Sequence, residues 1–159
     1  MKICIVYSSL RGNTEAAAFI LASFLEDLGL SAQLVGADAY DYETLLEADG
    51  LAIGSYTYGN HAEIPEELLD LYEDLPDLIQ ANPKLKQALA VFGSGDRDYP
   101  IYAKAVDDFV EVIEKSGGHL LAPGVKIDGY PDYDEEIAGL AAIAQAFLQI
   151  AKENNWWEP

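Results

Sequence analysis

The chain has 159 residues, of which 50% are hydrophobic, and its 28 acidic side chains outnumber 9 basic ones to give a formal net charge of −19. This length and composition predict one folded domain, residues 1–159, rather than a disordered segment. The negative charge argues against nucleic acid or an anionic membrane as a partner and favours proteins with basic docking faces, although acidity also serves solubility alone.

Apolar runs and the helical spacing of apolar residues predict strands that alternate with helices. In chain order they are a strand at 2–7, a helix at 14–28, a strand at 32–35, a short helix or turn at 42–48, a strand at 50–55, a helix at 65–75, a strand at 88–93, a helix at 102–116, a strand at 120–127 and a helix at 134–154. This alternation predicts an α/β fold, a three-layer doubly wound sandwich around a five-stranded parallel sheet.

The sequence also indicates where the protein works. Cys4 is the one cysteine, so an internal disulfide is excluded and a reducing compartment is favoured. We expect neither a signal peptide nor a membrane-spanning segment, because no apolar run is long enough, and we therefore expect a cytoplasmic protein. Near the end of the chain, Trp156 and Trp157 either dock on the body or stay exposed, and both alternatives remain open.

The loop at residues 8–14 follows the first strand and leads into a helix. Hydroxyls of Ser8, Ser9 and Thr14, the amide of Asn13 and the free N–H groups of the helix end form a neutral cradle suited to a phosphate. Gly12 allows close approach of the backbone. The alternative is that Asn13 or Thr14 only caps the helix, which explains one polar residue but not the run. The loop is neither a nucleotide P-loop nor a G-x-G-x-x-G turn.

Two further loops follow strands at the same edge of the predicted sheet, where ligands of open parallel sheets bind. Residues 56–61 carry Tyr56 and Tyr58 beside a probable turn at Gly59 and Asn60, and residues 93–100 carry glycines followed by Tyr99. An exposed tyrosine stacks on a planar ligand, although a lone tyrosine often only covers the edge of a core. Together the three loops predict a phosphorylated planar cofactor, flavin mononucleotide (FMN).

Four segments in this order resemble the flavodoxin family: YSSLRGNTE, GSYTYGNHAEIPEELLDLYEDL, VFGSGDRDYPIYAKAVDDF and VKIDGYPDYDEE. The last strand is not split by a long insertion, which resembles the short-chain branch. The resemblance implies a flavodoxin-like sheet order 2-1-3-4-5 and a low-potential one-electron carrier rather than an enzyme. It implies that non-covalent FMN cycles between semiquinone and hydroquinone, that electrons pass between a flavodoxin or ferredoxin reductase and acceptor enzymes, and that the protein is a monomer.

The resemblance also implies the cofactor-binding residues, with no catalytic residue and no metal ligand. The phosphate-loop positions are Ser9, Leu10, Arg11, Gly12, Asn13 and Thr14. The loop on one flavin face comprises Tyr56, Thr57, Tyr58, Gly59 and Asn60, and the loop on the other face and the pyrimidine edge comprises Ser94, Gly95, Asp96 and Tyr99. Leu10 and Arg11 stand where the family often has threonines. Arg11 either pairs with the phosphate or points to solvent, and solvent is slightly favoured because backbone N–H groups alone complete the cradle.

Three alternatives to a carrier remain. The first is an FMN-dependent NAD(P)H quinone or azo-compound reductase of the same fold, and the second is an FMN-binding sensor or storage module. A receiver-type signalling domain shares this sheet order, but it needs an acidic pair after the first strand and an Asp after the third. Ser8-Ser9 and Tyr56-Thr57 stand at those places and argue against it.

Asn60 and His61 generate a prediction about the reduction potential. They stand where the family commonly has acidic residues or glycine, so less negative charge lies beside the flavin, and His61 adds pH-dependent positive charge. We expect the potential for forming the hydroquinone to be less negative than in relatives with an acid there. Replacing Asn60 by Asp (N60D) should lower that potential in an anaerobic redox titration, and an unchanged value would contradict this.

Overall fold

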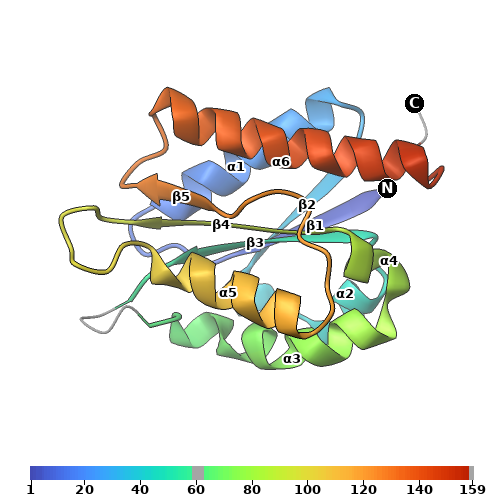
Figure 1. Ribbon diagram of the computed structural model, residues 1–159, viewed down its shortest axis with the longest axis horizontal. Coiled ribbons are helices and arrows are strands. Elements are labelled where there is room, and N and C mark those ends of the chain that lie inside the picture. The colour runs from blue at the N-terminus through green and yellow to red at the C-terminus, as the bar shows by residue number, and fades with distance from the viewer. Residues whose placement is uncertain (59–62, 158–159) are drawn as a thin grey trace.

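The backbone is organised around a parallel β-sheet. The computed structural model describes residues 1–58 and 63–157. Within these residues, five parallel strands form one sheet with the order β2-β1-β3-β4-β5 (Figure 1). The strands are β1 (Lys2–Tyr7), β2 (Ser31–Gly36), β3 (Gly50–Tyr56), β4 (Leu89–Gly95) and β5 (Val125–Asp128). The predicted α/β fold and the sheet order implied by the resemblance are therefore confirmed.

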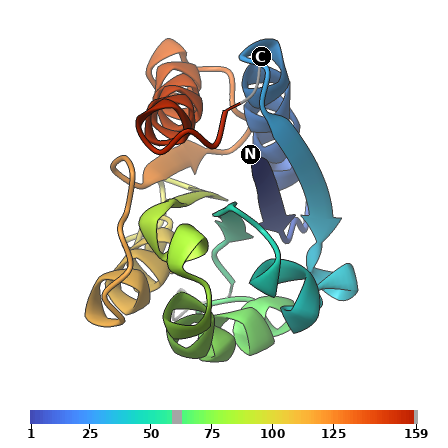
Figure 2. The same cartoon turned by 90° about the vertical axis from the view of Figure 1, so that its right-hand side faces the viewer.

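Helices cover both faces of this sheet. One face carries α1 (Asn13–Asp27) and α6 (Asp134–Glu153), and the other carries α2 (Tyr42–Leu46), α3 (Leu69–Ala81), α4 (Pro83–Gln87) and α5 (Lys104–Lys115) (Figure 2). Successive side chains of a strand point to opposite faces. Accordingly, Ile3 and Ile5 of β1 join the core under α1 and α6, whereas Cys4 and Val6 join the core on the opposite face. Short 3-10 helices occupy η1 (Ala37–Ala39) and η2 (Glu66–Leu68).

The third predicted helix differs from the structure at both ends. Its first residues form the 3-10 helix η2, and α3 then continues past the predicted end at residue 75 to Ala81. Pro76 lies inside α3 and lacks a backbone donor, which is normally a reason to end a helix. Leu78 and Ile79 beyond it are fully buried, so packing of the apolar face holds the helix together across the proline.

The last strand is shorter than predicted. β5 pairs with β4 only over Val125–Asp128, although residues 120–127 were expected to be extended. Before it, Leu120 makes a single parallel bridge to Leu89. Pro123 follows and lacks the N–H needed for a continuous ladder. The apolar character of this segment therefore reflects packing rather than strand pairing along its whole length.

A buried asparagine joins α2 to α4. Asn82 is 6% exposed, and its Oδ1 accepts a hydrogen bond from the backbone N–H of Leu85 (3.1 Å), which caps α4. Its Nδ2 faces three carbonyl oxygens at the end of α2, those of Leu45 (3.0 Å), Leu46 (3.0 Å) and Ala48 (2.8 Å). One side chain thus satisfies polar groups of two helices, of which the sequence predicted a helix or turn at α2 and nothing at α4.

The tryptophans near the end of the chain dock on the body. Both are half-buried against the core under α1 and α6. The carbonyl of Trp156 accepts a hydrogen bond from the amino group of Met1 (2.9 Å), and Trp157 Nε1 donates to the carbonyl of Leu28 (3.3 Å). The ammonium of Lys152 lies 5.0 Å from the centre of the Trp157 ring. Across the described residues, no helix is long and apolar enough to cross a membrane.

Replacing Asn82 by Ala should lower the free energy of unfolding by about 2–4 kcal/mol, because it removes a helix cap and leaves buried carbonyls without a donor. Equilibrium unfolding in urea measures this. Asn154→Ala is the matched control, because Asn154 donates to a single carbonyl, that of Ile150 (2.9 Å), at the end of α6. We expect a cost of about 1 kcal/mol or less for the control. Equal costs for the two variants would contradict the joining role of Asn82.

Candidate functional site

The carboxyl ends of β1, β3, β4 and β5 open onto one cavity of about 640 Å³. This volume lies in the range of small-molecule sites, about 300–1,000 Å³. The loops that follow these strands gather at the left side of Figure 1. The cavity is lined by Ser9, Leu10, Arg11, Asn13, Tyr56, Thr57, Tyr58, Ser94, Gly95, Asp96, Tyr99, Pro100, Ile101, Ala103, Asp128 and Gly129.

Most residues predicted to bind a cofactor come together in this cavity. Its lining contains Ser9, Leu10, Arg11 and Asn13 of the first loop, Tyr56, Thr57 and Tyr58 of the second, and Ser94, Gly95, Asp96 and Tyr99 of the third. Gly12 and Thr14 lie in the first loop but outside the lining. Gly59 and Asn60, like His61, lie outside the described residues. The structure thus gathers the residues, while their roles toward a cofactor stay predictions.

The first loop enters α1 through a left-handed glycine. Gly12 has φ +87°, a conformation that is inexpensive only for glycine, and its N–H donates to Ser9 Oγ (3.1 Å). Among the described residues, no side chain caps α1, so neither Asn13 nor Thr14 plays the capping role considered from the sequence. The N–H groups of the first turn, at Asn13, Thr14 and Glu15, therefore have no helical partner and suit an anion.

Thr14 ties the first loop to the third. Its hydroxyl lies 2.6 Å from the hydroxyl of Ser94, and Thr14 is 1% exposed and Ser94 5% exposed. This hydrogen bond joins the first turn of α1 to the end of β4. The Thr14 side chain thus supports the wall of the cavity rather than facing into it.

Glycines of the third loop allow close packing. A Cβ on Gly93 would lie 2.2 Å from the carbonyl oxygen of Ser55, and one on Gly95 would lie 2.8 Å from the backbone nitrogen of Ala103. Either contact is closer than a Cβ tolerates. Thr57 from the second loop adds a further link, because its Oγ1 accepts from the N–H of Ala105 in the first turn of α5 (3.2 Å).

Two tyrosines line the cavity with most of their surface free. Tyr58 is 56% exposed and Tyr99 is 65% exposed, so neither serves mainly to cover the core. Tyr58 also packs edge to face with Tyr56, with ring centres 6.5 Å apart. Exposed aromatic faces in a concave site suit stacking on a planar ligand.

Glu67 in η2 is a site residue that the sequence did not reveal. One carboxylate oxygen accepts hydrogen bonds from the hydroxyls of Ser8 (2.5 Å) and Tyr56 (2.8 Å). Burial alone would raise the pKa of Glu67, but these hydrogen bonds and one from its own backbone N–H hold the pKa below its ordinary value. Burial and the Glu67 carboxylate raise the pKa of Tyr56 to about 12. The resulting clamp joins the ends of β1 and β3.

Asp128 and Gly129 also line the cavity and were not predicted from the sequence. They follow the last strand, so the rule that ligands bind at carboxyl ends of parallel strands was a signal for them. Asp128 Oδ1 accepts from the backbone N–H of Arg97 (3.2 Å), and its own N–H donates to Glu136 (2.8 Å). Pro100, Ile101 and Ala103 complete the lining and belong to the approach to α5, which carried no polar signal.

Comparison with known proteins agrees with this arrangement. The family model described as Flavodoxin matches residues 5–141. The chain belongs to the flavodoxin family. It is 35% identical over 154 residues to probable flavodoxin 1 of Bacillus subtilis (strain 168), covering 97% of this chain and 94% of that protein.

Solved structures support the same assignment to the flavodoxin family. The flavodoxin of Streptococcus pneumoniae TIGR4 superposes with a TM-score of 0.81 at 36% identity, covering 94% of this chain and 99% of that one. A short-chain flavodoxin associated with a non-canonical PDU bacterial microcompartment superposes with a TM-score of 0.83 at 31% identity, covering 95% and 99%. The protein is thus an electron carrier of the flavodoxin type rather than an enzyme, and the family implies a flavin cofactor and redox partners.

The Glu67 clamp gives a prediction for stability. Glu67→Gln should be less stable than the native protein by about 1 kcal/mol at pH 7, because charged acceptors strengthen hydrogen bonds but this one is largely exposed. Since the folded-state pKa of Glu67 is lowered, its contribution is present above the ordinary pKa of 4.5 and is lost as pH falls through the lowered value. Urea unfolding between pH 7 and pH 3 measures both effects.

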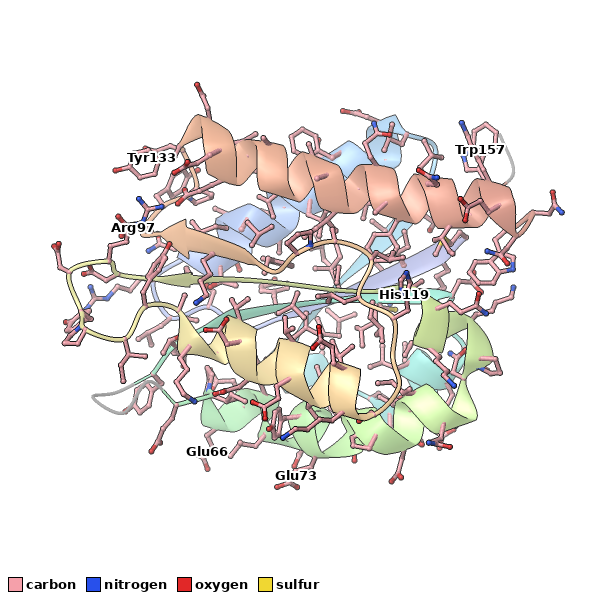
Figure 3. All side chains as sticks on the ribbon, viewed as in Figure 1. Glu66, Glu73, Arg97, His119, Tyr133 and Trp157 are labelled. Carbon is pink, nitrogen blue, oxygen red and sulfur yellow. The ribbon has the colours of Figure 1, made fainter. Side chains whose placement is uncertain are left out.

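The control for this prediction is Glu66→Gln, which removes the same charge from the neighbouring exposed position (Figure 3). No side-chain hydrogen bond involves Glu66 among the residues that the structure describes, so we expect little change in stability. A Glu67→Gln deficit that persists unchanged at pH 3, or that equals the Glu66→Gln effect, would contradict the clamp.

Proposed function

We propose that the protein is a one-electron carrier that binds FMN non-covalently in this cavity, with residues 1–159 forming a single FMN-binding domain. The observation that carries the proposal is that the end of α1, uncapped by any described side chain, and two exposed tyrosines border the same cavity. The helix end suits a phosphate and the tyrosines suit a planar ring, and FMN contains both groups.

The donor set at one end of the cavity fits a phosphate. Ser9 and Asn13 line the cavity there, and the first-turn N–H groups of α1 point out of the helix end. The helix dipole of a 15-residue helix adds a positive field at the same place. In the proposed complex, Ser9, Asn13 and these N–H groups hold the phosphate.

Other lining residues of the cavity fit a ring. Tyr58 and Tyr99 provide aromatic faces on the second and third loops, and Thr57 and Gly95 line the wall beside them. Thr57 is bound to α5 and Gly95 packs against Ala103, so these two positions are fixed by contacts within the protein. A preordered site lowers the entropic cost of binding.

The flavin, when bound, supplies the redox chemistry, while the protein supplies binding and electrostatics. Asp96 and Asp128 both line the cavity. Their carboxylates, and the net charge of −19, raise the energy of any further negative charge that develops there. This favours a low reduction potential and requires no acid, base or nucleophile from the protein.

We propose that the partners are a flavodoxin or ferredoxin reductase and acceptor enzymes with basic faces, and that the protein works as a monomer in the cytoplasm. Exposed carboxylates on η2 and α3 support this, among them Glu66 and Glu73 (Figure 3), together with Asp70 and Asp77. Complementary charge speeds the encounter of such proteins and loses its effect as salt screens it. The lone Cys4 agrees with a reducing compartment.

Anaerobic photoreduction of the FMN-loaded protein, followed by visible absorption, tests the proposal. A one-electron carrier should show a long-wavelength band that rises and then falls as the two electrons enter separately. The same sample mixed with NADPH alone should stay oxidised, because a carrier needs a reductase.

Direct passage from yellow to colourless, together with rapid reduction by NADPH alone, would contradict the proposal and favour the two-electron reductase. Failure of the purified protein to retain FMN would contradict the assignment of the cavity itself.

A further inference from the structure

The charge of this protein opposes the binding of an anion. A phosphate monoester carries close to two negative charges at neutral pH, and the chain has a formal net charge of −19. Two carboxylates, those of Asp96 and Asp128, line the cavity directly. Neutral hydroxyls and backbone N–H groups donate hydrogen bonds, but they leave the net charge unchanged. A tightly bound dianion therefore benefits from a local cation.

Arg11 is such a cation. Of the described residues that line the cavity, it is the one with a basic side chain, and it lies one residue before Gly12, the N-cap residue of α1. No carboxylate of the described residues lies within ion-pair distance of Arg11. Arg11 is thus an exposed residue of the cavity lining, and its guanidinium has no competing carboxylate among those residues.

The charges of the cavity lie on different loops. Arg11 stands on the first loop, just before α1, whereas Asp96 follows β4 and Asp128 ends β5. The backbone of Asp128 is held by Glu136, and its carboxylate accepts from Arg97. An anionic group is therefore attracted by Arg11 on the first loop and repelled by the carboxylates that follow β4 and β5.

We infer that the guanidinium of Arg11 binds the phosphate of FMN and makes this cavity select the phosphorylated flavin over riboflavin. The inference rests on the proposed function, since it concerns the phosphate of the proposed cofactor. It reverses the slight preference for solvent drawn from the sequence, in which Asp128 was not recognised as a second carboxylate of the cavity lining. Arg11 acts as a specificity residue because a planar guanidinium offers paired donors to a phosphate.

Binding of two flavins to the flavin-free protein tests this inference. The dissociation constants of FMN and riboflavin are measured by quenching of flavin fluorescence, for the native protein and for Arg11→Gln. We expect Arg11→Gln to weaken FMN binding about 10-fold to 100-fold, the usual range for a lost charged hydrogen bond. Riboflavin binding should change less than about twofold, because riboflavin has no phosphate for Arg11 to bind.

Two further variants sharpen the result. Arg97→Gln removes the same charge, but Arg97 is paired with Glu135 (3.4 Å) and does not line the cavity, so it controls for the change in net charge. It should weaken FMN binding by less than about threefold. Arg11→Lys retains the charge and should bind FMN more tightly than Arg11→Gln. The loss caused by Arg11→Gln should also shrink at 1 M salt, where charges are screened within about 3 Å.

The outcomes separate the inference from the proposed function. Loss of FMN affinity in Arg11→Gln with riboflavin affinity retained supports the inference. Equal loss for both flavins, or FMN affinity equal to that of the native protein, overturns it while leaving FMN binding intact. Inability of the native protein to bind FMN at all overturns the proposed function and the inference together. Circular dichroism of each variant shows that the fold is retained.

Discussion

The parallel pairing of β1, β3, β4 and β5 is the constraint on which the site depends. Strands joined by right-handed crossovers end at the same edge of the sheet, so loops far apart in the chain begin side by side. The strand register shows which loops begin side by side. Tyr56 at the end of β3 pairs with Ser94, and Gly95 at the end of β4 pairs with Asp128. Gly93 permits the close approach, since a Cβ there would meet the carbonyl of Ser55.

Contacts between the loops then shape the cavity. The hydroxyl of Thr14 is bound to Ser94, Thr57 caps α5, and Glu67 holds Ser8 and Tyr56 together. Some of the polar side chains in these loops, which by composition alone suit a ligand, thus bind other loops instead. A supporting shell of this kind holds the wall of the cavity in place before a ligand arrives, which is what precise binding needs.

The charges of the protein have two opposite roles, toward redox partners and toward the phosphate of a bound flavin. An acidic surface attracts basic partners and disfavours extra negative charge on a bound flavin, whereas a phosphate needs a positive environment. Different residues serve the two roles. The uncapped end of α1 and the Arg11 side chain act over a few ångströms at the first loop, while the carboxylates lie on the loops after β4 and β5 and over the surface. Screening by salt keeps the distant carboxylates from cancelling the local positive field.

Local patterns determined much of this protein. Apolar periodicity was enough to predict the alternation of strands and helices. A helix or strand that is buried on one or both faces has apolar residues at a characteristic spacing in the sequence. Turn-forming and hydroxyl residues after three strands were enough to predict most of the residues that line the cavity. Two predicted bounds were wrong near prolines. Helix α3 continues through Pro76 because its apolar face is packed, whereas β5 begins only after Pro123.

Only the tertiary structure decided which side chains meet across long separations. Asn82 reaches the end of α2, Glu67 reaches the residue after β1, and Asp128 reaches the cavity, and the sequence around each of them does not indicate which groups it contacts. The sequence also left open whether the tryptophans near the end of the chain are docked or exposed. The structure shows that they pack against the core under α1 and α6. By itself, the sequence determined the fold class and the three polar loops, because these follow from local composition. The structure decided the partners of each side chain, because those depend on how the sheet and its crossovers fold back on one another.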